Sequence, residues 1–462
     1  MSPTKPAPIA IVGGGPCGLT LARLLERAGL EYVVFERDAS ADAAHGQQGG
    51  TLDLHPGTGQ AALAAAGLTA EFEAAARREA AVLTVQDSLG GHFYRHHSPD
   101  DGRRGTAADR PEIDRAQLRA ILLASVPAAR VRWGKALRAV EREGDGDGDG
   151  DGAAGCVLRF ADGSAEKGFR LVVGADGAWS KVRPLITPAK PKYSGKTFFE
   201  GRISHANPQY AAAQALAGPG NSLAIGAGRA LVVQQMADRT YRVYAGLEEP
   251  DIDALTRPDG GVLHFPSPSP SSSSPSAADA EDAARAALLA RFDGWAPHLR
   301  RFIECAEGPW RVWPLHTFSE ETYTHTHTTT ATTTTTPAEG SESGGWKRAR
   351  GVVLLGDAAH VTLPNGEGVN AAMLDALRLC EFLVAEIGAG SGSGSDSGGE
   401  FDPRADGDAV ERAIVRYEDD MLPRAREHVA DGVAMGDVMY APDGAERMIA
   451  MFASFAEQAG QA

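Results

Sequence analysis

The residues with the clearest chemical meaning are three glycines near the start of the chain, Gly13, Gly15 and Gly18, spaced as GxGxxG. In such a motif the first glycine permits a tight turn, the second lets a pyrophosphate approach the backbone, and the third lets a helix pack closely on a strand. The following helix would direct its amide donors and positive dipole end toward the phosphates. Taken alone the motif is weak, because a glycine-rich turn without a ligand also satisfies it.

The elements around these glycines supply the context that the motif needs. Residues 8–12 form an apolar run that predicts a buried strand, residues 17–28 have apolar positions near helical spacing, and residues 31–35 predict a second strand. Such a βαβ unit has parallel strands and a right-handed crossover. Glu36 ends the second strand, where a carboxylate would accept ribose hydroxyls. The unit therefore predicts a dinucleotide site, without separating FAD from NAD.

Two aspartates follow further apolar runs and extend this pattern. Asp176 belongs to GADGAWSKVR, which comes after a predicted strand at residues 170–173. Asp357 belongs to GDAAH, which comes after a predicted strand at residues 351–355. Taken alone, GDAAH indicates no more than a structural turn between a strand and a helix.

The order of the three motifs, GxGxxG then DG then GD, resembles the flavoprotein aromatic hydroxylases over nearly the whole chain. Within that family the chain is most similar to the tetracycline-inactivating monooxygenases, through residues 49–55 (GGTLDLH), 112–115 (EIDR), 118–123 (LRAILL) and 180–183 (SKVR). The resemblance implies that FAD is bound, besides the motif glycines, by Glu36, Arg37, Asp53, Arg115, Asp176, Asp357, Gly366, Gly368, Val369 and Asn370.

The chemistry of these residue types suits that role. Asp357 at a strand end can accept the ribityl hydroxyls of FAD, and the guanidinium of Arg115 has a shape that matches phosphate oxygens. Gly366 and Gly368 let the backbone lie close under the flavin ring, where amide donors would stabilise negative charge on the reduced flavin. Two simpler interpretations stay open: Arg115 as a solvated helix charge, and Asp53 as a carboxylate of a strand end or turn.

Several positions depart from the pattern of the family. Gly46 stands where the relatives carry an arginine assigned to NADPH, so NADPH and NADH both stay open as co-substrates. Glu367 replaces a glutamine and would place a negative charge near the flavin. Gly201 and Ser222 stand at the approximate positions of the substrate-binding glutamine and arginine. Recognition of tetracycline therefore does not carry over.

The fold that we predict is α/β. It has a Rossmann-like GxGxxG FAD-binding domain with a parallel sheet, interleaved with a mostly antiparallel substrate-domain sheet and followed by a long helix interrupted at Pro423. The expected FAD-binding parts are residues 1–75, 105–185 and 346–387. The expected substrate-domain parts are residues 76–104 and 186–321. Low-complexity loops are expected at residues 322–345 and 388–407, and a C-terminal helical segment at residues 408–462.

Composition excludes several classes of protein. The 462 residues carry 61 acidic and 45 basic side chains, a formal charge of −16, which argues against nucleic-acid binding. Because no apolar run could span a membrane and no signal peptide is visible, we expect a cytoplasmic protein without a membrane partner. The four cysteines form no CxxC pair, and we predict no metal site. Alternating aspartates at residues 145–151 and the THTHT of residues 324–328 are weak metal candidates.

The resemblance implies a single-component FAD monooxygenase that uses NADPH or NADH and O2 to hydroxylate an aromatic or polyketide-like small molecule. In that family a C4a-hydroperoxyflavin carries the oxygen, so we assign no catalytic side chain. Trp313 and Pro364 are predicted to line the substrate pocket, with core packing as the alternative for Trp313. A flavin reductase or dehydrogenase without oxygen insertion, and a non-catalytic flavin-bound regulatory protein, are the alternative functions. We expect a monomer or a weak homodimer.

Overall fold

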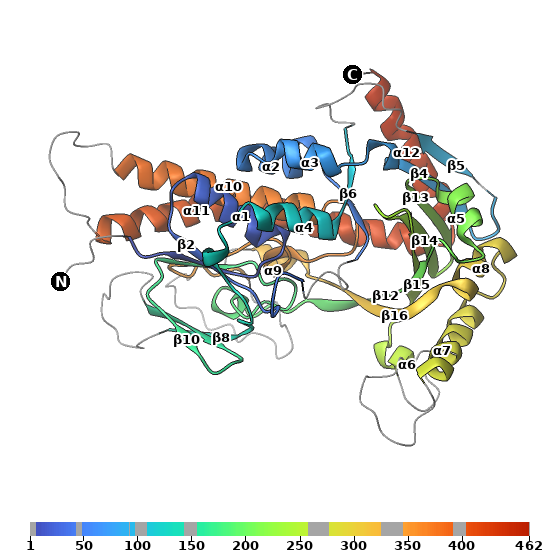
Figure 1. Cartoon of the computed structure of the whole chain (residues 1–462), viewed down its shortest axis with the longest axis horizontal. Coiled ribbons are helices and arrows are strands. Elements are labelled where there is room, and N and C mark those ends of the chain that lie inside the picture. The colour runs from blue at the N-terminus through green and yellow to red at the C-terminus, as the bar shows by residue number, and fades with distance from the viewer. Residues whose placement is uncertain are drawn as a thin grey trace, which may run out of the picture.

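A parallel sheet of five strands forms one core of the molecule (Figure 1). The computed structural model describes residues 6–42, 49–91, 93–97, 109–142, 155–256, 277–324, 345–390 and 403–461. Within them the parallel strands lie in the order β17-β11-β1-β2-β7. Their bounds are β1 Ile9–Val12, β2 Tyr32–Phe35, β7 Val131–Arg132, β11 Leu171–Gly174 and β17 Val352–Leu354. Nearly all of their residues are buried, as in a parallel sheet covered on both faces, so the predicted sheet is confirmed.

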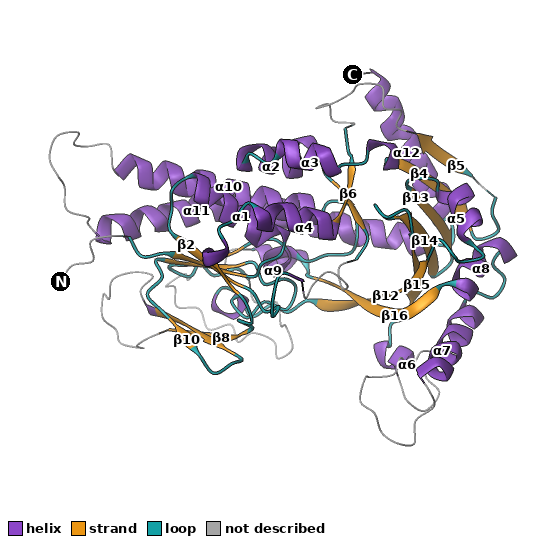
Figure 2. Ribbon diagram, in the orientation of Figure 1, coloured by secondary structure: helices purple, strands orange, loops and turns teal. Residues whose placement is uncertain are grey.

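Helices cover one face of the parallel sheet and a small antiparallel sheet covers the other (Figure 2). The covering helices include α1 Pro16–Arg27, α4 Arg115–Ala124 and α10 Gly368–Gly390. The small sheet comprises β8 Leu137–Arg142, β9 Cys156–Phe160 and β10 Ala165–Glu166. It packs through Phe160, whose ring centroid lies 4.9 Å from that of Phe35.

A second sheet of seven strands has the order β16-β12-β15-β14-β13-β4-β5. Its strands are β4 Val82–Asp87, β5 Tyr94–His97, β12 Lys192–Ile203, β13 Asn221–Gly226, β14 Arg229–Gln235, β15 Tyr241–Glu248 and β16 Glu307–Thr317. Every neighbouring pair is antiparallel except β13 with β4. The predicted, mostly antiparallel sheet is therefore confirmed. One of its faces is covered by α5 Tyr210–Ala217, α7 Ala277–Arg291 and α8 Pro297–Cys305.

A two-stranded ribbon connects the two sheets. It pairs β3 Thr51–Asp53 with β6 Glu112–Asp114. The Thr51 N–H donates to Gln234 Oε1 of the seven-stranded sheet at 3.0 Å, and Asn221 Nδ2 donates to Glu112 Oε1 at 3.0 Å. The remaining helices are α2 Ala61–Ala66, α3 Thr69–Ala75, α6 Ile252–Thr256, α9 Asp357–His360 and α12 Gly444–Gln461. Short 3-10 or π turns are η2 Pro56–Gln60, η3 Arg78–Ala80, η4 Ala128–Arg130, η6 Arg183–Leu185 and η7 Glu320–Tyr323.

The longest helix, α11 Pro403–Tyr440, differs from the sequence-based expectation. It begins before residue 408 and continues through Pro423, so the predicted interruption is wrong. A proline inside a helix costs about 3 kcal/mol, because it lacks an N–H and its ring meets a carbonyl of the preceding turn. Burial of Tyr417, Leu422 and Val429 on both sides of the proline offsets this cost.

Several predictions fall on parts of the chain outside the described residues. These are the bulk of the low-complexity loops, Gly46, and the weak metal candidates at residues 145–151 and 325–328. No described helix combines the length and the apolar character needed to cross a membrane.

Candidate functional site

The GxGxxG turn connects β1 to α1, and packing within the protein is enough to require two of its three glycines. Gly13 has φ +109°, and a Cβ there would lie 2.2 Å from the Ala175 carbonyl oxygen. A Cβ on Gly18 would lie 2.1 Å from the Gly13 carbonyl oxygen. Gly15 is different, because its φ is −80° and a Cβ there would meet no atom within 4 Å. No described residue requires a glycine at position 15, so the open space beside it suits a ligand.

Glu36 lies at the end of β2, as predicted, and is buried. Its Oε2 accepts the Gly14 N–H at 2.5 Å and its Oε1 accepts the Asp38 N–H at 2.9 Å. The sequence did not single out Arg119, yet its buried guanidinium donates to the Gly14 carbonyl oxygen at 3.0 Å and pairs with Asp38. Arg37 is exposed. Glu36 and Arg119 thus both bind the backbone of Gly14. No described side chain caps the amino end of α1.

The GxGxxG, DG and GD motifs meet at one edge of the parallel sheet. The carboxyl ends of β1, β11 and β17 are adjacent, because parallel neighbours end at the same side. Hydrogen bonds connect the first residues after these strands: Gly13 N–H to Phe35 O (2.9 Å), Ala175 N–H to Val12 O (2.8 Å) and Leu355 N–H to Gly174 O (2.9 Å). Residues separated by more than 300 positions therefore form one surface.

The DG motif places a carboxylate at this edge with one oxygen unused. Asp176 Oδ2 accepts the Lys181 N–H at 2.7 Å, whereas the buried Oδ1 has no hydrogen-bond partner among the described residues. Burial raises the pKa of Asp176. Arg183, also from this motif, donates to the Ala358 carbonyl oxygen of the GD turn at 3.2 Å. The DG and GD motifs are thus connected by a hydrogen bond.

The GD turn begins at Gly356, whose φ is +57°, and presents Asp357 as an exposed carboxylate at the start of α9. A fully buried aspartate of α10, Asp375, anchors the turn from behind. Its Oδ2 accepts the Gly356 N–H at 3.0 Å and lies 2.6 Å from His360 Nε2. Its Oδ1 lies 3.0 Å from Arg424 Nη1 of α11. Asp375 therefore fixes the turn that exposes Asp357.

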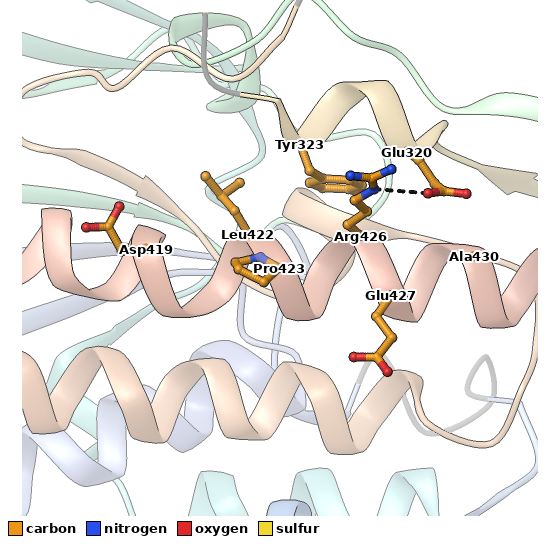
Figure 3. Close-up of a pocket in the computed structure, with 8 residues that line it drawn as sticks. All are labelled: Glu320, Tyr323, Asp419, Leu422, Pro423, Arg426, Glu427 and Ala430. Atoms are coloured by element: carbon orange, nitrogen blue, oxygen red, sulfur yellow. Dashed lines mark hydrogen bonds and ion pairs between the residues drawn. The ribbon is translucent and has the colours of Figure 1, made fainter. Parts of the chain in front are cut away.

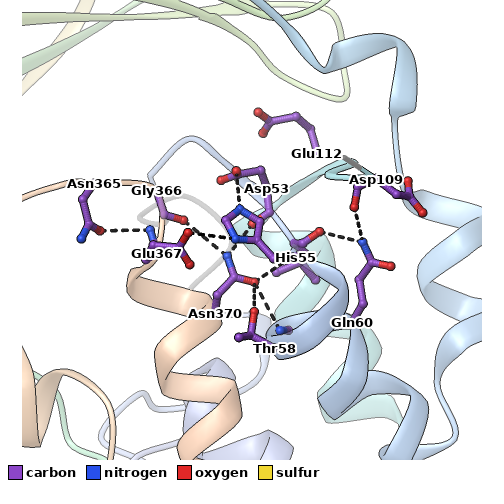
Figure 4. A network of polar contacts seen from close by, with 12 residues as sticks. Asp53, His55, Thr58, Gln60, Asp109, Glu112, Asn365, Gly366, Glu367 and Asn370 are labelled. Carbon is purple, nitrogen blue, oxygen red and sulfur yellow. Dashed lines mark hydrogen bonds and ion pairs between the residues drawn. The ribbon is translucent and has the colours of Figure 1, made fainter. Parts of the chain in front are cut away.

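A second polar network lies where β3 meets the start of α10 (Figure 4). His55 Nε2 lies 2.8 Å from Asp53 Oδ2, and His55 Nδ1 lies 3.0 Å from Glu367 Oε1. Burial alone would lower the pKa of His55, but its contacts with both carboxylates raise the pKa to about 9. On the other side of Asp53, burial and the Asp53 charge raise the pKa of Glu112 to about 7. Asp53 is thus part of an ion pair.

Asn370 uses its side chain to hold this network together. Its Oδ1 accepts the His55 N–H at 2.9 Å and the Thr58 hydroxyl at 3.2 Å. Its Nδ2 donates to the Asp53 carbonyl oxygen at 2.9 Å. Because the amide is occupied by the protein, the structure assigns the side chain of Asn370 to shaping the turn.

The remaining predicted residues lie around the same region with more open side chains. Arg115 begins α4 and is half-buried, without a hydrogen bond or ion pair to any described side chain. Gly366 and Pro364 are exposed, Gly368 begins α10, and a Cβ on Gly368 would meet no atom within 4 Å. Val369 packs against the main core.

Trp313 lies on β16, opposite Phe198 of β12. It is 40% exposed, so core packing does not explain it, and its Nε1 donates to Glu200 Oε2 at 2.7 Å. The register places Trp313, Phe198 and Tyr244 on the same face as Gln234, which contacts the β3–β6 ribbon. This aromatic face is therefore turned toward the ribbon that carries Asp53.

Comparison with known families decides the class of the protein. The family described as FAD binding domain matches residues 6–200 and 322–398, more than half of the chain. The chain belongs to this family. Monooxygenase penA of Penicillium thymicola is 30% identical over 457 residues, covering 92% of this chain and 94% of the relative. The 3-amino-4-hydroxybenzoate 2-monooxygenase PtmB3 of Streptomyces platensis is 27% identical, covering 96% and 90%.

The protein is an FAD-dependent monooxygenase of the aromatic hydroxylase family, as the three motifs predicted. The crystal structure of tetracycline destructase Tet(51) has the same fold, with a TM-score of 0.59 and 15% identity, covering 97% of this chain and 95% of the other.

The residues of this monooxygenase fit an FAD at the shared edge. The space beside Gly15 would admit a pyrophosphate at the amino end of α1. Asp176 Oδ1, which has no hydrogen-bond partner among the described residues, and the exposed Asp357 carboxylate supply acceptors, and the half-buried Arg115 supplies a cation. The space beside Gly368 would admit a flat ring against the amino end of α10.

A pocket of about 540 Å³ lies elsewhere on the monooxygenase, between η7 and α11 (Figure 3). Its rim includes the ion pair of Arg426 Nε with Glu320 Oε2, at 3.0 Å. Tyr323, Leu422 and Pro423 supply its apolar lining. It contains none of the predicted site residues, so we do not place the cofactor there.

Proposed function

We propose that this monooxygenase is reduced by NADPH or NADH and transfers one atom of O2 to an aromatic or polyketide-like molecule. The observation that carries the proposal is the meeting of the GxGxxG, DG and GD motifs at one sheet edge, together with the aromatic face of Trp313, which is turned toward the ribbon that carries Asp53. The activity named for PtmB3, on an aminohydroxybenzoate, supports an aromatic substrate. We also propose a cytoplasmic monomer or weak homodimer.

The chain would hold FAD along the edge from α1 to α10. The turn of Gly13, Gly15 and Gly18 would take the pyrophosphate, and Glu36 the adenosine ribose. Phosphate oxygens would be bound by Arg37 and Arg115. Asp53, Asp176 and Asp357 would accept hydrogen bonds from hydroxyl or ring N–H groups of FAD. The turn at residues 364–369 would lie against the flavin. Asn370 acts by holding that turn.

Bound FAD supplies the activation of oxygen, and the protein supplies position, charge and exclusion of water. Trp313, with Phe198 and Tyr244 on the same face, would pack against a planar substrate, since aromatic rings stack favourably. Pro364 would contact the substrate from the turn before α10. We propose the predicted division into FAD-binding and substrate parts on the same grounds.

The oxygen-transfer step is tested with labelled O2. Aromatic acids, phenols and polyketides are first screened for accelerated NADPH or NADH oxidation by the FAD-loaded protein. We expect the product of an accelerating compound to carry one labelled oxygen atom. A compound that is turned over without incorporated label would favour a reductase or dehydrogenase instead. Purified protein that neither contains nor takes up FAD would overturn the proposal altogether.

Asp357→Ala is expected to weaken FAD binding at least tenfold, because it removes an acceptor for the ribityl hydroxyls. The Asp357 side chain is exposed and forms no hydrogen bond to a described residue, so the folded apoprotein should keep its stability to within about 0.5 kcal/mol. FAD titration and thermal unfolding of the apoprotein measure the two effects separately. An unchanged FAD affinity would remove Asp357 from the site.

A further inference from the structure

His55 is held between two carboxylates that come from distant parts of the chain. Its ring is buried, and its two nitrogens lie 2.8 Å from Asp53 Oδ2 and 3.0 Å from Glu367 Oε1 (Figure 4). A neutral imidazole has a single N–H and could donate to only one of these oxygens. Both contacts are hydrogen bonds when the ring is protonated. The geometry therefore indicates an imidazolium that bridges β3 to the turn before α10.

The bridge also settles how the charge of Glu367 is balanced. Asp53 and Glu367 each contribute one negative charge and His55 one positive charge. Among the described residues, two further groups with a shifted pKa face the network: Glu112, beside Asp53, and His428 of α11. The pKa of Glu112 is raised to about 7, first by burial, and the pKa of His428 is lowered to about 4, first by burial. His428 is then neutral near pH 7 and leaves His55 as the cation paired with Glu367.

The bridge is rigid because the backbone on both sides is fixed. The His55 N–H donates to Asn370 Oδ1 at 2.9 Å, and the Asp53 carbonyl oxygen accepts from Asn370 Nδ2 at 2.9 Å. In the turn, the Glu367 N–H donates to Asn365 Oδ1 at 3.0 Å. A shift of the His55 ring would therefore shift the carboxylates rather than be absorbed by a loop.

We propose that His55 is a positioning residue of the flavin site, which ties the turn at residues 364–368 to Asp53 and cancels the charge of Glu367. The inference rests on the proposed function, since that turn is where we place the flavin ring. The sequence alone predicts that Glu367 places a negative charge near the flavin. In the inferred arrangement that charge is balanced, because Glu367 forms an ion pair with His55. Loss of His55 would leave two adjacent carboxylates and an uncompensated negative charge.

The test compares sulfite binding by the FAD-loaded full chain, because sulfite is an anion that adds reversibly to oxidised flavins and responds to local charge. At pH 7 we expect Glu367→Gln to bind sulfite about fivefold more tightly, the effect of one unit charge near a partly buried site. We expect His55→Asn to bind it more weakly by a similar factor. The double variant should return toward the wild-type constant.

The pH dependence gives a second readout. The dissociation constant of sulfite for His55→Asn, divided by that for the wild type, should be about five at pH 7. This ratio should fall toward one above about pH 9, where His55 loses its proton. Taking the ratio cancels the titration of sulfite and of the flavin itself. His205→Asn serves as the control, because His205 is exposed and its described contacts, with the Asp238 carbonyl oxygen and the Tyr210 ring, lie outside the His55 network.

The apoprotein supplies a readout without flavin. Thermal unfolding of the two single variants and the double variant should be non-additive, because the two residues form one ion pair. Sulfite constants of Glu367→Gln and His55→Asn within twofold of wild type, with additive unfolding, would overturn the inference. Should His55→Asn fail to fold, Glu367→Gln alone decides, since Glu367 is 42% exposed. A wild-type chain that binds no FAD would instead contradict the proposed function.

Discussion

Replacing Asp375 by alanine is expected to destabilise the protein by about 3–5 kcal/mol, the cost of breaking a buried charge pair from one side. We also expect loss of FAD binding, because Asp375 holds the turn that exposes Asp357. Chemical unfolding of the apoprotein measures the first effect, and FAD titration at low temperature, where the variant is still folded, measures the second.

The size of this effect follows from what Asp375 satisfies. Its fully buried carboxylate accepts the Gly356 N–H, contacts His360 Nε2 at 2.6 Å and contacts Arg424 Nη1 at 3.0 Å. Alanine would leave a buried backbone donor unpaired and His360 without its counter-charge, and neither group can reach bulk water. Asparagine keeps the shape but not the charge, so its cost should be smaller.

The contacts of Asp375 with His360 and Arg424 determine how its contribution to stability changes with pH. Burial alone would raise the pKa of Asp375, but His360 and Arg424 hold the pKa below its ordinary value. The stability that Asp375 contributes is therefore fully present above its unfolded pKa of about 4, and is lost as the pH falls through the lower folded value. Asp375→Ala should unfold with a weaker dependence on pH in this acid range than the wild type.

Asp420 provides a matched control. It pairs with the same Arg424 at 2.7 Å but is one-quarter exposed. Asp420→Ala should cost at most about 1 kcal/mol, as exposed ion pairs do. If Asp375→Ala were no more destabilising than Asp420→Ala, Asp375 would not be the anchor of the GD turn.

Gly13 and Gly15 are expected to respond to alanine in opposite ways. Gly13→Ala should destabilise the protein by about 3 kcal/mol or more, because φ is +109° and the new Cβ would lie 2.2 Å from the Ala175 carbonyl oxygen. Gly15→Ala should change the stability of the apoprotein by no more than about 0.5 kcal/mol, because φ is −80° and the Cβ meets nothing within 4 Å.

FAD affinity separates folding from binding at these two positions. We expect Gly15→Ala to weaken FAD binding at least tenfold, since the new methyl group would occupy the space that the pyrophosphate needs. Gly407→Ala in α11 is the control, because its Cβ also meets nothing within 4 Å and it is far along the chain from the motif. Wild-type FAD affinity in Gly15→Ala would place the pyrophosphate elsewhere.

Local patterns were sufficient for the elements that frame the site. The apolar runs before Gly13, Asp176 and Asp357 form strands of one parallel sheet, as predicted, because burial on both faces demands unbroken apolar residues. The continuous α11 was not predicted, because the cost of Pro423 is visible in the sequence and the packing that offsets it is not. Residue types also indicated Asp357 and Arg115, whose side chains are open in the structure.

The sequence by itself determined the βαβ unit and the three motifs, because each depends on neighbours a few residues apart. The order of those motifs along the chain, through its resemblance to a family, indicated FAD. Only the tertiary structure decided how the site is held. His55 meets Glu367, Asn370 is occupied by the segment of Asp53, and Asp375 supports Gly356 from behind. A lone aspartate in the apolar pattern of α10 was a signal that could have indicated Asp375. No sequence signal indicated its partner Arg424 on α11, because contacts between distant segments impose no spacing on the sequence.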